Sequence, residues 1–130
     1  MDQKFIPDDV AQFVIDKIDS VAELEALLLL RNAPDREWTA RELANRLYLG
    51  VKDAVDILAA LSAKGLAFCK SGESGAYKYQ PGLLEVGDMI DRLCDIYSKQ
   101  IVPVTNLIHS KSKTRVQEFA DAFNLRKKDD

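Results

Sequence analysis

Apolar residues recur every three or four positions near the start of the chain, and this spacing predicts an amphipathic helix. Pro7 stands where the first position of a helix tolerates proline, and Asp8 and Asp9 follow in the first turn. The apolar face of this helix carries Val10, Phe13, Val14 and Ile18.

A second helix is predicted from Val21 to about Asn32. Ser20 and Glu23 have the spacing of a capping box that opens a helix, and Pro34 ends the segment. Because Leu27 to Leu30 make this helix apolar on nearly all sides, we expect it to lie in the core.

A third helix is predicted after another capping box, formed by Thr39 and Glu42. Leu43 and Leu47 supply its buried stripe, and it ends near Tyr48-Leu49-Gly50.

A fourth helix follows at once, from Val51 to Lys64, with Gly65 in the position that favours helix termination. Its apolar residues at helical spacing are Val51, Val55, Leu58 and Leu61. Two helices joined by so short a turn predict a helix-turn-helix.

The period then changes from that of a helix to that of strands. Two short runs with aromatic residues, 66–70 and 76–80, flank the Gly-rich loop 71–75, which predicts a β-hairpin. Tyr77 and Tyr79 alternate with Lys78, so they point to the face opposite Lys78, where we expect them to pack on the core.

The predicted fold is therefore mainly α with a small β-hairpin, in the order of a winged helix-turn-helix. At 130 residues with 47% apolar side chains, the chain has the size and core material of one domain. We divide it into an N-terminal helix (1–20), a winged-helix core (21–81) and a C-terminal helical extension (82–130).

Part of the core also resembles a known family. The resemblance lies in Trp38-Thr39-Ala40-Arg41-Glu42-Leu43-Ala44, in Leu58-Ala59-Ala60-Leu61 with Lys64-Gly65-Leu66, and in Tyr77-Lys78-Tyr79. These segments are similar to bacterial winged-helix regulators, and the layout is most similar to the MarR and PadR types. The resemblance covers residues 21–81 and implies DNA binding by a dimer held together by flanking helices. The chain departs from MarR-type proteins in its short wing, which lacks their usual Asp and Arg pair.

A long apolar stripe follows the predicted hairpin, with Pro103 expected to bend or interrupt its helix. We expect an apolar stripe of this length to be buried against another surface. Two alternatives stay open: the same helix of a second chain in a homodimer, by analogy with such regulators, or the chain's own winged helix. The candidate dimer-interface residues are Val86, Ile90, Leu93, Tyr97, Ile101, Val104 and Ile108.

The end of the chain predicts one more short helix. Thr114 and Gln117 have capping spacing, and an apolar face of Val116, Phe119, Ala120 and Phe123 follows. The basic connector before it carries Lys111, Lys113 and Arg115, which form either an anion site between paired chains or a solvated linker.

The charge is unevenly distributed within a net value of −3. Residues 1–30 carry two Lys against seven Asp and Glu, whereas residues 31–82 carry eight basic against six acidic side chains. A DNA-binding protein usually has a larger basic excess. The start of the chain lacks the pattern of a signal peptide and no apolar run is long enough to span a bilayer, so we expect a cytoplasmic protein with two free thiols, Cys69 and Cys94.

We expect no enzymatic activity. The single histidine, His109, has no nucleophile placed beside it by any recognisable motif, and the two cysteines lack the spacing of metal ligands. The Gly-rich loop lies between two strands and not between a strand and a helix, so it is no phosphate loop. We therefore predict no metal and no cofactor.

Binding of double-stranded DNA is the first functional hypothesis, as a homodimeric transcriptional regulator. The second helix of the motif would enter the major groove, although Asp53 and Asp56 there are repelled by phosphates. Lys52 either faces the bases or forms an i, i+4 ion pair with Asp56. The candidate DNA-binding residues are Arg36, Arg41, Arg46, Lys52, Lys70 and Lys78. The alternative is a winged helix that binds another protein and does not bind DNA.

Overall fold

The computed structural model describes residues 6–69 and 75–110, and this part is mainly helical with a small antiparallel sheet of three strands. In chain order its elements are α1 (Asp8–Lys17), α2 (Val21–Asn32), β1 (Trp38–Thr39), α3 (Ala40–Leu47), α4 (Val51–Ala63), β2 (Ala67–Cys69), β3 (Ala76–Tyr79) and α5 (Leu84–Lys99). A further helical stretch covers residues 101–110. The predicted terminal helix, the basic connector 111–115 and Lys70 lie outside the described residues.

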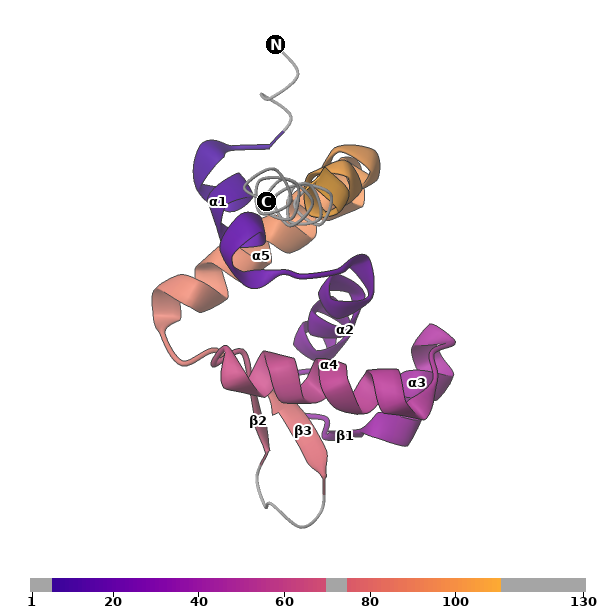
Figure 1. Cartoon of the computed structure of the whole chain (residues 1–130). Coiled ribbons are helices and arrows are strands. Elements are labelled where there is room, and N and C mark those ends of the chain that lie inside the picture. The colour runs from indigo at the N-terminus through magenta and orange to yellow at the C-terminus, as the bar shows by residue number, and fades with distance from the viewer. Residues whose placement is uncertain (1–5, 70–74, 111–130) are drawn as a thin grey trace, which may run out of the picture.

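Helix α2 lies at the centre of the molecule (Figure 1). On one side of it are α3, α4 and the sheet, with which it is in contact, and on the other side are α1, α5 and the last helical stretch. The interior is formed from leucines of α2 and α4 together with side chains of α1 and α5. The prediction that the helix from Val21 to Asn32 lies in the core is confirmed, since Leu24, Leu27 and Leu30 are fully buried.

The first helix is confirmed with its predicted apolar face, because Val10, Val14 and Ile18 are fully buried. The capping box predicted for α2 is only half formed. The Ser20 hydroxyl accepts a hydrogen bond from the Glu23 backbone N–H at 3.1 Å, but the Glu23 carboxylate accepts from the Asp19 N–H at 2.9 Å. Glu23 is buried beside Lys64, and this ion pair determines where its side chain points.

The predicted hairpin is confirmed as β2 and β3, which pair antiparallel with Phe68 opposite Lys78. The sequence analysis missed β1, whose Trp38 pairs with Tyr77, so that β3 is the central strand of the order β1-β3-β2. Two residues are too few to show an alternating pattern, although an aromatic and a β-branched residue are typical of strands. Trp38 is 1% exposed, and this burial fixes the start of α3 against the sheet.

The long C-terminal helix is interrupted near the predicted proline. Helix α5 ends at Lys99, and the next helical stretch begins at residue 101 with Pro103 in its first turn. Proline has no N–H to donate to the carbonyl four residues earlier, and its ring collides with that carbonyl, so the helix cannot continue through this point.

Most side chains of the apolar stripe in this region are buried in the core of the same chain. Ile90, Leu93, Val104 and Ile108 are at most 1% exposed, and Val86 and Tyr97 are partly buried against the same core. Of the seven residues assigned to a dimer interface, Ile101 alone is an exposed side chain, at 54%. This burial corresponds to the alternative in which the stripe folds back onto its own chain, since its buried side chains belong to the same hydrophobic core as those of α1 and α2. In the part of the chain described, no helix has the length and apolar character needed to cross a bilayer.

Candidate interaction surface

The α3–α4 pair is fixed by local capping interactions. The capping box of Thr39 and Glu42 is complete, since each side chain accepts from the other residue's backbone N–H, at 3.2 and 3.0 Å. Helix α3 ends at Tyr48, whose φ of 58° lies in the left-handed region. Helix α4 begins directly after Gly50, so the short turn predicted between these helices is confirmed.

The predicted core face of α4 is wrong in part. Ala54, Leu58 and Leu61 are fully buried, whereas Val51 and Val55 are 46% and 50% exposed. Apolar side chains at helical spacing occur on two sides of this helix, and spacing alone does not tell which side meets α2 and the sheet. The side with Leu58 does so, and Leu58 belongs to the same hydrophobic core as the leucines of α2.

The exposed side of α4 forms a small apolar surface with the turn before it. We call the α4 surface the exposed side chains of Tyr48, Val51 and Val55, with Ala59 one turn further along. Val51 and Val55 are four positions apart, so they lie on one side of α4, and Tyr48 lies in the turn directly before this helix. Tyr48 is 94% exposed, which places almost its whole ring in solvent.

The charges beside the α4 surface are mixed. Lys52, Asp53 and Asp56 are all exposed on α4. The i, i+4 ion pair expected between Lys52 and Asp56 is not among those formed by the described residues. One lysine against two aspartates therefore gives this helix no positive potential.

Two of the predicted DNA-binding arginines lie beside Trp38. The guanidinium of Arg36 stacks over the indole ring at 3.6 Å from its centroid, and that of Arg46 lies 5.9 Å away. Arg36 is also 3.7 Å from the Glu42 carboxylate, an ion pair that lowers the pKa of Glu42 together with its stronger hydrogen bond from the Thr39 backbone. Arg36 is thus already engaged by an aromatic ring and a carboxylate.

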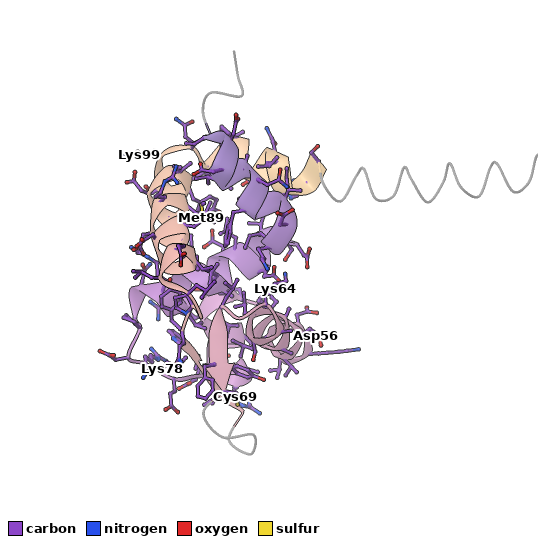
Figure 2. The ribbon with its side chains drawn as sticks, turned by 90° about the vertical axis from the view of Figure 1, so that its left-hand side faces the viewer. Asp56, Lys64, Cys69, Lys78, Met89 and Lys99 are labelled. Carbon is purple, nitrogen blue, oxygen red and sulfur yellow. The ribbon has the colours of Figure 1, made fainter. Side chains whose placement is uncertain are left out.

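The remaining basic candidates within the described residues lie on three different elements. Arg41 and Lys52 are exposed on α3 and α4, while Lys78 is half-buried on the central strand. Figure 2 shows Lys78 at one side of the sheet and Asp56 of α4 at the other. Within the described residues the structure brings Arg36 and Arg46 together at Trp38.

A buried ion cluster holds α4 against the N-terminal helices. The ammonium of Lys64, at the end of α4, donates to the Lys17 carbonyl at 2.7 Å and to the carboxylates of Asp19 at 3.0 Å and Glu23 at 2.7 Å. The Glu23 side chain is only 5% exposed. The sequence analysis missed this cluster, because Lys64 is 41 or more positions from each of its partners and no motif links them.

Two tyrosine hydroxyls lie at the contact between α2, β3 and α5. Burial raises the pKa of Tyr79 to about 12, and the carboxylate of Asp91 acts in the same direction. Burial also raises the pKa of Tyr97 to about 12, assisted by the hydrogen bond that its hydroxyl donates to Glu25 at 2.6 Å.

These shifts predict that stability falls at high pH. Tyrosine in an unfolded chain has a pKa of about 10, so below about pH 10 both states hold the protons and the stabilisation is complete. Between about pH 10 and pH 12 the unfolded chain loses these protons first, and the free energy of unfolding decreases. Urea unfolding across this range should show the decrease, and a Tyr79→Phe and Tyr97→Phe double variant should show less of it. Ionisation of all four tyrosines near pH 10 in the folded protein, seen by tyrosinate absorbance, would contradict the shifts.

Within residues 6–69 and 75–110, no group of three or more His, Cys, Asp or Glu side chains is arranged to hold a metal ion. His109 is exposed near the end of the described helix. Cys94 is half-buried, with its sulfur 3.4 Å from the Arg31 guanidinium, and no disulfide joins it to Cys69. Comparison of the chain with protein-family models, curated proteins and solved structures found no match.

Proposed function

We propose that this chain is a winged-helix module that binds a partner protein through the α4 surface. The order α2, β1, α3, α4, β2, β3, with β3 between β1 and β2, supports the winged-helix assignment. Winged helices serve more than one function, so the assignment of a partner depends on the surface itself.

The proposal rests on the exposure of Val51 and Val55 on α4 and of Tyr48 in the turn before this helix. In a DNA-binding helix-turn-helix, this helix presents polar and basic side chains to base edges and phosphates. Here the helix presents two aliphatic side chains, 46% and 50% exposed, and the turn before it adds an aromatic ring that is 94% exposed. Tyrosine and aliphatic anchors of this kind are typical of protein interfaces, where they account for much of the binding energy.

Tyr48 also makes an unfavourable contribution to the fold, which supports a role outside it. Its left-handed backbone conformation costs a residue with a Cβ roughly 1 kcal/mol, and its ring is not buried in return. A glycine would meet the needs of the turn better. The presence of tyrosine is explained if the ring contacts a partner.

The mixed charges around the α4 surface favour the same class of partner. Asp53 and Asp56 repel phosphates, but in a protein interface they orient a partner that carries basic side chains. We expect a photo-reactive amino acid at Val55 to form an adduct with a discrete protein in an extract of the source cells. The same amino acid at Val102, which is 66% exposed on another helix, is the matched control. Equal adducts from both positions would contradict the assignment.

Replacing Tyr48 with glycine is expected to separate folding from binding. The variant should gain roughly 1 kcal/mol in the free energy of unfolding, because the left-handed strain is removed. It should at the same time lose most of the Val55 adduct with the partner. Urea unfolding and the adduct yield are measured on the same preparation. A variant that is less stable than the parent, or that keeps its full adduct yield, would show that Tyr48 serves the fold instead.

A second candidate, a DNA-binding regulator, is favoured by the convergence of Arg36 and Arg46 at Trp38. Two neighbouring guanidinium groups suit one phosphate, and Arg41 lies exposed on the same helix as Arg46. Fluorescence anisotropy with a randomised duplex at low and moderate salt decides this candidate. Binding that weakens with salt, and weakens further in an Arg41→Ala and Arg46→Ala variant, would favour the regulator.

A further inference from the structure

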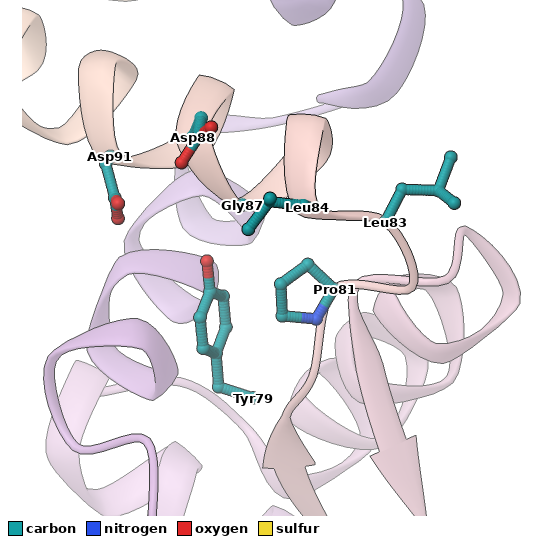
Figure 3. Close-up of a pocket in the computed structure, with 7 residues that line it drawn as sticks. All are labelled: Tyr79, Pro81, Leu83, Leu84, Gly87, Asp88 and Asp91. Carbon is teal, nitrogen blue, oxygen red and sulfur yellow. The ribbon is translucent and has the colours of Figure 1, made fainter.

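A pocket of about 400 Å³ lies where the sheet is joined to α5, away from the α4 surface (Figure 3). Its wall is formed by the end of β3, by the loop that follows and by the first turns of α5. Pockets for small ligands have volumes of roughly 300–1,000 Å³, so this one has the size for a small molecule.

Most of the wall is apolar and exposed at the mouth. Leu83 is 63% exposed and Leu84 is 81% exposed, and the ring of Pro81 lies beside them. A Cβ on Gly87 would stand 3.4 Å from the Pro81 ring, so the glycine leaves room for this edge of the pocket. Two adjacent exposed leucines are unfavourable in water, and an apolar ligand body would cover them.

Tyr79 lines the inner end of the pocket, and its hydroxyl is buried behind this wall. The Tyr79 hydroxyl is buried and has no hydrogen bond within the described part of the chain. Figure 3 shows its ring standing beside Pro81 with the hydroxyl directed toward α5.

The charges at the rim are negative. Asp91 is held by Arg31, whose Nε lies 2.9 Å from the carboxylate. Asp88 is exposed and has no hydrogen-bond or ion-pair partner among residues 6–69 and 75–110. Among the described residues that line the pocket there is no lysine or arginine, so the uncompensated carboxylate of Asp88 favours a positively charged ligand.

We infer that this pocket binds a small organic ammonium ion, with its apolar body against Leu83 and Leu84 and its charged head at the carboxylate of Asp88. The apolar wall selects against inorganic cations, which have no body to cover the leucines. The carboxylate selects against anions. Because the mouth is open, we expect dissociation constants in the range of about 0.1–1 mM, toward the weak end of specific binding.

Three molecules of the same shape test the inference: 2-phenylethylammonium, 2-phenylethanol and phenylacetate. Calorimetric titration of the full chain should show the ammonium ion binding at least tenfold more tightly than the alcohol, and phenylacetate binding more weakly than both. Amide chemical-shift changes should be largest at Gly87 and Asp88. Equal affinity for the ammonium ion and the alcohol, or chemical-shift changes spread over exposed acidic residues outside the pocket, would overturn the inference.

An Asp88→Asn variant supplies the second test. This substitution should weaken binding of the ammonium ion about tenfold and leave binding of the alcohol unchanged. Because Asp88 is exposed, the fold should not be affected. Asp95→Asn is the matched control, since Asp95 is an exposed acid of α5 that pairs with Lys99 outside the pocket. An equal effect of the two substitutions on ammonium binding would show attraction to net charge alone and would overturn the site.

Discussion

Replacing Lys64 with methionine is expected to lower the free energy of unfolding by roughly 3 kcal/mol. The substitution leaves the Glu23 carboxylate 5% exposed without its cation, and it removes the donor that the Lys17 carbonyl and Asp19 share. Breaking a buried ion pair on one side is costly because the remaining charge stays desolvated. Urea unfolding followed by the fluorescence of Trp38, the chain's single tryptophan, measures the change.

The control for this cluster is an exposed ion pair. Lys99 lies 3.3 Å from Asp95, with both side chains more than half exposed, so Lys99→Met should change stability by less than about 1 kcal/mol. A second substitution, Glu23→Gln in the Lys64→Met background, should recover part of the loss because the buried charge is gone. If Lys64→Met unfolds at the same urea concentration as the parent, the cluster does not hold α4 to the N-terminal helices.

A double substitution of Val51 and Val55 with glutamate is expected to weaken binding to the partner protein by about thirtyfold or more, as loss of an interface hot spot does. Both side chains are about half exposed, so the change in stability should stay within about 0.5 kcal/mol. The affinity is measured with the protein captured from the Val55 adduct, and urea unfolding is measured in parallel.

Val102→Glu is the control for the double variant, because Val102 is an exposed valine outside the α4 surface. It should bind the partner like the parent. A double variant that also binds like the parent would place the interface elsewhere on the molecule.

The parts of the fold that follow from local patterns were predictable. The capping box at Thr39 and Glu42 involves residues three apart, and the hairpin is marked by a Gly-rich loop between two short runs. The core position of α2 follows from its apolar character on all sides. In each case the physical cause lies within a few residues of the chain.

The parts that depend on distant residues were not predictable. Spacing indicated Val51 and Val55 as core positions, but the packing of α4 on α2 buries Ala54 and Leu58. The pairing of Glu23 with Lys64 depends on the way the chain folds back. The same holds for the stripe in α5, whose period indicates burial but not whether the cover is the chain itself or a second copy.

The candidate site was predictable in location but not in character. The sequence analysis pointed to α3 and α4 and to the arginines of α3. The exposed valines of α4 become apparent only once the buried side of this helix is known. Stacking of Arg36 on Trp38 likewise depends on β1, which two residues of sequence do not indicate.

The decisive measurement for the α4 surface is photo-crosslinking from position 55 in an extract that contains both proteins and nucleic acids. Each adduct is divided and treated with protease or with nuclease before electrophoresis. We predict a discrete adduct that protease removes and nuclease leaves unchanged, and that is absent from position 102. An adduct that nuclease removes would contradict protein binding and assign the α4 surface to DNA.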